Sequence, residues 1–454
     1  MNPLAAPSPR TAARRKGAGW GRRAWNTLRL LGAAALLLAA CQPAAGLLPP
    51  TPQPTATPAA QIPTPQQSPT PAPTAVSTQI LTIWVPPGFD PRGQVRGADV
   101  LLARIRAFED QNPGVQVKIR VKAPNGPGGL LESLSAATLA APEALPSLVL
   151  LSRTDLETAA LKGLVFPLDD LTAVMDEPDW FAYAAQLASL DGSVFGLPFA
   201  GDALLLLYRA EKVGSAPVQT WDDVMSRGQP LIFPAGDPQA LMTLALYRSL
   251  DGPLEDDMGR PALDPVRLAQ VFSLYAEGAQ QGAFPYWLGQ FQTDGQAWQG
   301  YREPRGTWVV TWSSRYLAEL PVDTAAAELP SLGDHAYTLA TGWLWAMPDP
   351  HPERREMAVR LAEFLTASEF QQEWSAAAGY LPTRPSALAA WNNQSLQSML
   401  NQAALSAETR PANDLVASIG PVLQEAVLQV IKSQSDPLQA AEAAAERLRE
   451  TQSP

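Results

Sequence analysis

Cys41 is the only cysteine among the 454 residues, so its thiol has no partner for an intramolecular disulfide. It ends an apolar run from Leu30 to Ala40, with Leu38-Ala39-Ala40 directly before it, and seven basic residues and no acidic residue precede it. A basic region, a short apolar run and small residues before a cleavage site are typical of a secretory signal peptide. The run has 11 residues, whereas a helix that spans a bilayer needs ~20. We therefore predict a signal peptide over residues 1–40 and a lipid on the Cys41 thiol, as in a bacterial lipobox.

The stretch from Gln42 to Thr78 contains eleven prolines and no charged residue. Such a composition buries too little apolar surface to offset the entropy of ordering, and its prolines favour extended polyproline II conformations. We therefore expect residues 41–78 to be a disordered stalk that lets a domain move above the membrane to which Cys41 anchors it. The pair Arg22-Arg23 leaves open whether export uses the general secretory or the twin-arginine route.

Side chains that bind soft metals or act as nucleophiles are scarce after the stalk. That part contains two histidines, His335 and His351, and no cysteine, which leaves few ligands for zinc or copper. The sequence contains no P-loop, G-x-S-x-G or H-E-x-x-H motif. The carboxylate pairs fit turns and helix caps; they are Asp169-Asp170, Asp222-Asp223 and Asp256-Asp257. We predict no metal site, no cofactor and no enzymatic activity.

The chain is acidic. Its formal net charge is −11, and removing the seven basic residues of the signal peptide leaves −18. Negative charge repels phosphate backbones, so nucleic acid is not an expected partner. About 375 residues follow the stalk, which exceeds the ~250–300 residues at which a single hydrophobic core stops growing. Two lobes are therefore expected.

Strands and helices are expected to alternate from residue 80 to residue 163. Apolar runs and alternation predict three strands, at 80–85, 115–122 and 148–151. Helical periodicity follows each strand, at about 99–108 with Asp99 as N-cap, at 130–140, and at 155–162 with Gly163 as its end. This alternation predicts an α/β lobe with a mostly parallel sheet.

Several motifs then occur in the order found in one family. They include Phe108-Glu109-Asp110-Gln111-Asn112-Pro113-Gly114, Leu164–Leu171, Leu190–Pro198, Thr220-Trp221-Asp222-Asp223, Thr341–Pro348 and Gly379–Arg384. Over essentially all of residues 79–450, the chain resembles the family 1 extracellular solute-binding proteins, the maltose-binding-protein type. One departure is Pro146-Ser147-Leu148, where the family usually has Pro-Asp-Val. The resemblance implies an α/β, two-lobed periplasmic-binding-protein fold in which each lobe is a mostly parallel sheet flanked by helices, with a hinge of several chain crossings.

The resemblance also implies a domain division and a function. Residues 79–198 with about 341–385 would form the first lobe, and residues 199–340 with about 386–450 the second. A small solute, with a carbohydrate favoured, would bind in the cleft between the lobes and pass to the permease subunits of an ABC importer. The protein would be a monomeric, extracytoplasmic lipoprotein anchored to the cell membrane.

Ligands of open α/β sheets bind beyond the carboxyl ends of the strands, so the resemblance places candidate ligand-binding residues at strand ends and crossings. These are Trp84, Asp202, Trp312, Trp343, Trp345 and Tyr380. Trp and Tyr offer flat apolar faces that suit sugar rings, and Asp202 can accept hydrogen bonds from hydroxyls or pair with a cation. The competing interpretation is a place in the core, favoured for Trp308 and Trp345 and left open for Trp84 and Trp312. Trp343 and Trp345 are two apart and are expected to point to one side of their strand.

Two other functions stay open at this point. A surface sensor or interaction lipoprotein with the same fold would lack a transporter, and neighbouring genes for permease subunits would separate the two cases. A secreted glycoside hydrolase would need two carboxylates ~5–10 Å apart across a groove, and no motif indicates such a pair.

Overall fold

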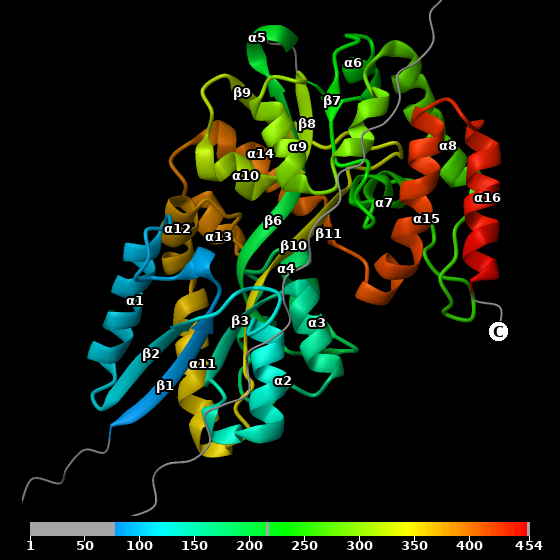
Figure 1. The fold of residues 1–454 in the computed structure, drawn as a ribbon. Helices are drawn as coiled ribbons and strands as arrows, with labels where there is room; N and C mark the ends of the chain where they lie inside the picture. The colour runs from blue at the N-terminus through cyan, green and yellow to red at the C-terminus, as the bar shows by residue number, and fades with distance from the viewer. Residues whose placement is uncertain (1–77, 215–217, 452–454) are drawn as a thin grey trace, which may run out of the picture. The chain divides into compact units, whose positions relative to one another are not determined.

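The structure is a computed structural model that describes residues 78–214 and 218–451. These residues belong to one compact unit (Figure 1). The predicted signal peptide, Cys41 and the proline-rich stretch up to residue 77 lie outside the described residues.

The first lobe has three layers: helices, sheet and helices. β1 (Gln79–Val85) pairs in parallel with β2 (Val115–Val121) and with β3 (Leu148–Ser152). One face is covered by α1 (Ala98–Gln111), α11 (Pro352–Thr366) and α12 (Ser368–Ala378). The other face is covered by α2 (Leu130–Ala140), α3 (Arg153–Leu161) and α4 (Ala182–Ala188).

The side chains of β1 point alternately toward these two helical layers. Leu81, Ile83 and Val85 pack on the side of α1 and α11, and Trp84 packs on the side of α2. The three predicted strands and the helix at 130–140 are confirmed. The prediction of Asp99 as an N-cap is wrong: α1 begins after Gly97, whose φ is 71° and at which a Cβ would lie 2.9 Å from that of Ala378. The helix expected at 155–162 begins earlier, at Arg153, because the Ser152 side chain caps it.

Two long strands connect the lobes. β6 (Gly196–Arg209) and β10 (Thr338–Ala346) run antiparallel side by side (Figure 1). In the first lobe β10 pairs antiparallel with β3. In the second lobe β6 pairs antiparallel with β8 (Trp308–Trp312) and β9 (Thr324–Glu328), and β8 pairs in parallel with β7 (Leu231–Ile232).

The main sheet therefore passes through both lobes in the order β2-β1-β3-β10-β6-β8-β7. The predicted α/β class is confirmed, and β6 and β10 add antiparallel pairs to the parallel strands. A separate hairpin joins β4 (Ser189–Leu190) and β5 (Ser193–Val194), and β11 (Ala407–Thr409) pairs with β10.

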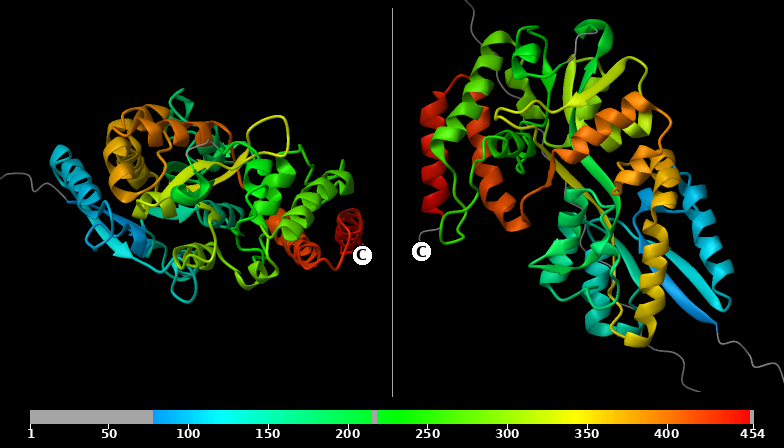
Figure 2. Two further views of the ribbon diagram at one scale, coloured as in Figure 1. Left: turned by 90° about the horizontal axis from the view of Figure 1, so that it is seen from above. Right: turned by 180° about the vertical axis from the view of Figure 1, so that it is seen from behind.

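Helices surround the second lobe and the connection between the lobes. The short ones are α5 (Ala210–Val213), α6 (Trp221–Met225), α10 (Ser313–Glu319) and α13 (Pro385–Ala389). The longer ones are α7 (Leu241–Arg248), α8 (Pro265–Gln281), α9 (Asp294–Arg302), α14 (Gln394–Leu405), α15 (Asn413–Ile431) and α16 (Pro437–Glu450). Figure 2 shows α8, α15 and α16 packed together at the outer edge of this lobe.

α15 is the one helix of the described chain that is long and apolar enough to cross a membrane by length and composition. Half of that apolar stretch is buried inside the protein, including Ile419, Leu423 and Val427. Packing against α8 and α16 explains its apolar composition, so α15 is a core helix of the second lobe.

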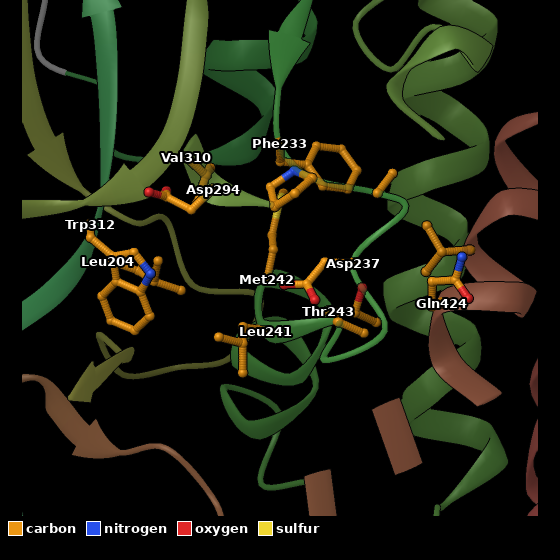
Figure 3. Close-up of a pocket in the computed structure, with 14 residues that line it drawn as sticks. Leu204, Phe233, Asp237, Leu241, Met242, Thr243, Asp294, Val310, Trp312 and Gln424 are labelled. Atoms are coloured by element: carbon orange, nitrogen blue, oxygen red, sulfur yellow. The ribbon is translucent and has the colours of Figure 1, made fainter. Parts of the chain in front are cut away.

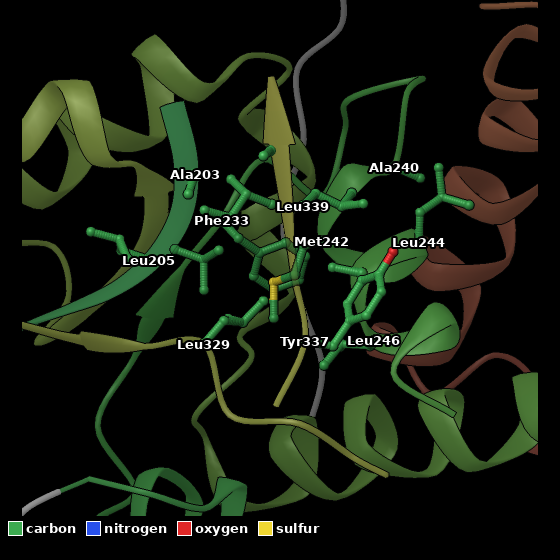
Figure 4. Packing of buried hydrophobic residues seen from close by; sticks show 14 of the residues in the cluster. Ala203, Leu205, Phe233, Ala240, Met242, Leu244, Leu246, Leu329, Tyr337 and Leu339 are labelled. Carbon is green, nitrogen blue, oxygen red and sulfur yellow. The ribbon is translucent and has the colours of Figure 1, made fainter. Parts of the chain in front are cut away.

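The core of the second lobe holds the crossing strands against α7. Leu205 of β6, Leu339 of β10 and Leu244 of α7 are buried together (Figure 4). Phe233 and Met242 join the same cluster from the two ends of the loop between β7 and α7. This packing fixes the ends of a loop that reaches the site described next.

Candidate functional site

A hollow of about 630 Å³ lies at the carboxyl ends of β1, β2 and β3. Each of these strands contributes the residues that follow it: Pro86 to Phe89 after β1, Pro124 and Asn125 after β2, and Ser152, Thr154 and Asp155 at the end of β3. Gln239 from the second lobe, Trp343 on the crossing strand β10 and Tyr380 after α12 complete the lining. The hollow is therefore built from both lobes and from a strand that joins them.

Three aromatic rings form one part of this lining. We call Phe89, Trp343 and Tyr380 the aromatic shelf. The ring centroid of Phe89 lies 5.0 Å from that of Trp343 and 5.2 Å from that of Tyr380. Behind the shelf, Trp374 stacks on Tyr380 with 5.8 Å between centroids. Because buried rings support it from behind, the shelf presents a preformed apolar surface to the hollow.

Among the described residues that line this hollow, Asp155 is the only one with a charged side chain. Its backbone N–H donates to Ser152 Oγ at 3.2 Å, and Ser152 Oγ donates to Asp155 Oδ2 at 2.9 Å. These contacts fix the carboxylate at the first turn of α3. Burial raises the pKa of Asp155, and the hydrogen bond from Ser152 opposes that rise.

A second, smaller hollow lies in the second lobe at the end of β8 (Figure 3). Trp312 lies beside its cross-strand partner Leu204, and Asp237 and Asp294 supply the carboxylates. Asp294 accepts a hydrogen bond from Thr311 Oγ1 at 2.5 Å and forms an ion pair with Arg315 at 3.0 Å. Burial, and secondarily the charge of Asp294, raise the pKa of Asp237.

Asp202 lies on β6 where the strand crosses between the lobes. Its Oδ1 accepts hydrogen bonds from Ser313 Oγ at 2.7 Å and from Ser314 N at 2.9 Å, and its Oδ2 accepts one from Ser314 Oγ at 2.5 Å. Burial raises the pKa of this carboxyl to about 6, although these three hydrogen bonds oppose the shift. Asp202 therefore ties the crossing strand to the start of α10 in the second lobe.

The neighbouring Gly201 allows a close approach of two other segments. Gly201 and Leu381 exchange backbone hydrogen bonds of 2.8 Å and 3.0 Å. A Cβ at Gly201 would lie 2.1 Å from the Tyr183 hydroxyl oxygen and 2.9 Å from the Leu381 carbonyl oxygen. This contact brings the segment that carries Tyr380 against the crossing strand.

Comparison with known proteins assigns the chain to a family. The sequence pattern of a family described as bacterial extracellular solute-binding protein matches residues 103–398. The chain belongs to this family. No curated protein matches its sequence.

Solved structures similar to this solute-binding protein share its fold at low sequence identity. Maltose-bound MalE3 of T. maritima has 18% identity and a TM-score of 0.62, and the match covers 82% of this chain and 100% of that one. The sugar-binding protein MalE of Xanthomonas citri has 17% identity and a TM-score of 0.66, with 82% and 97% covered. The cyclic alpha-maltosyl-1,6-maltose binding protein of Arthrobacter globiformis has 16% identity and a TM-score of 0.66, with 83% and 100% covered.

The residues predicted from the sequence lie in four places in the solute-binding protein. Trp343 and Tyr380 line the larger hollow, and Trp312 lines the smaller one. Asp202 lies at the crossing beside α10. Trp84 and Trp345 are buried in the core, Trp84 beneath Lys122, whose Nζ is 4.4 Å from the ring centroid, and Trp345 against Phe199 at 5.5 Å. Neither of these two lines a hollow.

Five further residues that line the hollows are not among the binding residues predicted from the sequence. They are Phe89, Asp155, Asp237, Gln239 and Asp294. Phe89 and Asp155 each lie four residues after the end of a predicted strand, so the strand-end rule could have found them. Asp237 and Gln239 follow β7, a strand of two residues, which is too short to give a periodic signal.

Proposed function

We propose that this solute-binding protein is an extracytoplasmic receptor that captures a carbohydrate between its lobes and delivers it to an ABC importer. The aromatic shelf is the observation that carries the proposal. It borders a hollow of about 630 Å³ at the carboxyl ends of parallel strands, where ligands of α/β sheets bind. That volume lies within the ~300–1,000 Å³ of typical small-molecule sites.

The chemistry of the lining suits a sugar. Flat rings pack on the apolar C–H faces of pyranose rings, and carboxylate, amide and hydroxyl groups form hydrogen bonds with sugar hydroxyls. The proposed contacts are Trp343 and Tyr380 from the shelf, Asn125 and Asp155 from the first lobe, and Gln239 from the second. Two of the similar structures named above are described as binding maltose or a cyclic maltosyl sugar, and the third as a sugar-binding protein, which supports the same class of ligand here.

Binding would act through closure of the two lobes. In this proposal residues 79–198 with about 341–385 form the first lobe, and residues 199–340 with about 386–450 form the second. A ligand held by Asp155 on one side and Gln239 on the other favours the conformation in which both reach it. The permease subunits of the importer would recognise that conformation, and the receptor would act as a monomer.

Isothermal titration with neutral mono- and oligosaccharides, a polyamine and a peptide tests the ligand class. We expect heat of binding from at least one carbohydrate and none from the polyamine or peptide. Binding of the peptide alone would contradict the carbohydrate proposal and leave the family assignment intact.

We also propose that a lipid on Cys41 anchors the receptor to the cell membrane. The single thiol after a signal-peptide pattern supports this. Expression in a bacterial host should place the unmodified protein in the membrane fraction and the Cys41→Ser variant in the soluble fraction. Equal membrane recovery of both proteins would contradict lipid anchoring at Cys41.

A further inference from the structure

The charges along the cleft are of one sign. Among the described residues that line the two hollows, the charged ones are Asp155, Asp237 and Asp294, and no lysine, arginine or histidine is present. A negative potential in a cleft with apolar walls is concentrated there and selects against anions. The three carboxylates differ in how far the protein itself compensates their charge.

The second-lobe carboxylates have cations near them. Asp294 pairs with Arg315, with 3.0 Å between Nε and Oδ2. Asp237 feels the positive charge of Arg410, which opposes the rise in the pKa of its carboxyl. Their negative charge is therefore partly compensated within the protein.

Asp155 has no such cation. No ion pair to it is found among residues 78–214 and 218–451, and no positive charge is among the causes that shift the pKa of its carboxyl group. Ser152 donates to Oδ2 only, and no described residue donates to Oδ1. A buried carboxylate with a single neutral donor is costly unless a further group compensates it.

Two buried arginines, Arg153 of α3 and Arg410, contact other groups. Arg410 Nη1 donates to Thr154 Oγ1 at 3.2 Å and to Asn413 Oδ1 at 2.7 Å. Arg153 feels the opposite charge of Glu157, one turn further along α3. Neither arginine lines the hollow that Asp155 lines.

The aromatic shelf is a second and independent feature that favours a cation. Ring faces attract ammonium groups through their negative quadrupole within ~6 Å of the centroid, most strongly for Trp and Tyr. Trp343 and Tyr380 line the same hollow as Asp155. A neutral sugar would pack against the aromatic rings but would leave the negative charge of Asp155 uncompensated.

We propose that the solute is a carbohydrate with a positively charged amino group, and that Asp155 binds this ammonium group while the aromatic shelf contacts the sugar ring. This proposal rests on the function proposed above and narrows its ligand class. It assigns Asp155 as the residue that distinguishes amino sugars from neutral and acidic sugars.

The test is titration calorimetry on the full mature protein. Four matched sugars are compared: D-glucosamine, D-glucose, N-acetyl-D-glucosamine and D-glucuronate. The β-1,4-linked disaccharides of the first three sugars are titrated as well. We expect D-glucosamine to bind at least about tenfold more tightly than the neutral sugars. A hydrogen bond to a charged group strengthens binding by roughly that factor relative to a hydrogen bond between neutral groups. The uronate should bind most weakly. Choline is included as an amine without a sugar ring.

Asp155→Asn removes the charge and keeps the side-chain shape, so the ratio of amine to neutral affinity should fall to about twofold or less. Asp222→Asn is the matched control, since it removes the same charge from an exposed position outside the cleft, and it should keep the ratio of the unmodified protein. A helix-capping role alone for Asp155 would lower stability and leave this ratio unchanged, which would overturn the proposal.

The outcomes separate the two proposals. If D-glucose binds as tightly as D-glucosamine, the amino-sugar inference is overturned and the carbohydrate function stands. If choline binds and no sugar does, both are overturned. The comparison of D-glucosamine with its N-acetyl derivative uses the unmodified protein, so it tests the proposal even if the Asp155→Asn variant does not fold.

Discussion

Trp343 and Trp345 are two positions apart on β10, yet their surroundings differ. Trp345 is fully buried and packs against Phe199, whereas Trp343 retains exposed surface and lines the larger hollow. The pairing of β10 with β6 shifts register between Trp343 and Leu344, at the point where the strand leaves the first-lobe core. Their positions along the strand, rather than their residue type, separate a residue that lines the hollow from a core residue.

Replacing each of these tryptophans should therefore have different effects. Trp343→Ala should weaken sugar binding about tenfold or more, which corresponds to about 1.4 kcal/mol, with little change in stability. Trp345→Ala should lower the free energy of unfolding by about 3–5 kcal/mol because it leaves a cavity in the core. Calorimetry and denaturant unfolding measure the two quantities. If the Trp343→Ala variant binds sugar as tightly as the unmodified protein, the aromatic shelf does not contact the ligand.

The raised pKa of Asp202 predicts how the stability of the folded protein changes with pH. Its pKa is raised from 3.8 to about 6 in the folded protein, chiefly by burial. Between these pH values the folded state binds more protons than the unfolded state, so the contribution of Asp202 to stability is greatest in acid and is lost as pH rises through about 6. The Asp202→Asn variant should lack this loss, and its stability relative to the unmodified protein should increase from pH ~4 to pH ~6. Urea unfolding at several pH values checks this, and parallel curves for the two proteins would contradict it.

The sequence locates some of these residues and not others, for physical reasons. Tyr380 follows a Gly379 turn and precedes Leu381-Pro382-Thr383, a motif that marks its place. The sequence leaves the place of Trp84 open, because a strand end and a strand core differ by one residue of alternation; in the structure Trp84 points into the α2 layer. Periodicity identifies Asp155 only as the start of a helix, because its lack of a cationic partner depends on residues far away in sequence, such as Arg410.

The loop between β7 and α7 carries Asp237 and Gln239 and is held from outside by α15. A Cβ at Gly420 of α15 would lie 2.2 Å from the Pro238 carbonyl oxygen and 3.1 Å from Gln239 Cα. The loop backbone thus passes so close to the helix that only glycine fits. A helix of the second lobe therefore positions the residue that completes the larger hollow.

Gly420→Ala tests this arrangement. Alanine favours a helix by about 1 kcal/mol over glycine, but overpacking against backbone costs about 1–3 kcal/mol, so we expect a net loss of stability and weaker ligand binding. Gly295→Ala in α9 is the control, because its Cβ would meet nothing closer than Arg315 Nη2 at 3.4 Å. Denaturant unfolding and calorimetry on both variants provide the measurement, and a more stable Gly420→Ala protein would show that the loop can move away.

Local secondary-structure elements are what the sequence predicts best. The apolar pattern predicts β1, β2, β3 and α2 within one or two residues, because local periodicity determines them. It does not predict that β10 inserts between β3 and β6, since the pairing of β10 with β3 joins residues about 190 positions apart, as Leu344 with Leu151 shows. Nor does it predict β7, whose two residues have their place only through pairing with β8.

At the scale of the whole molecule, the two walls of the cleft belong to different lobes, so a ligand that contacts both stabilises the assembly. Saturation at 100 times Kd should raise the free energy of unfolding by about 2.7 kcal/mol. Small-angle scattering should show a smaller radius of gyration with ligand than without it. An increase in stability with an unchanged radius would mean that binding occurs without closure.

The crossing strands also make the protein sensitive to changes in chain length. Ala340–Trp343 pairs with Ala200–Ala203, and side chains along each strand alternate between two faces. One residue inserted into either strand would exchange those faces beyond the insertion, and would displace Asp202 from its contacts with α10 or Trp343 from the larger hollow together with the core contacts of a whole lobe. An insertion in either crossing strand would therefore alter both lobes, because the two strands belong to the sheet of each lobe.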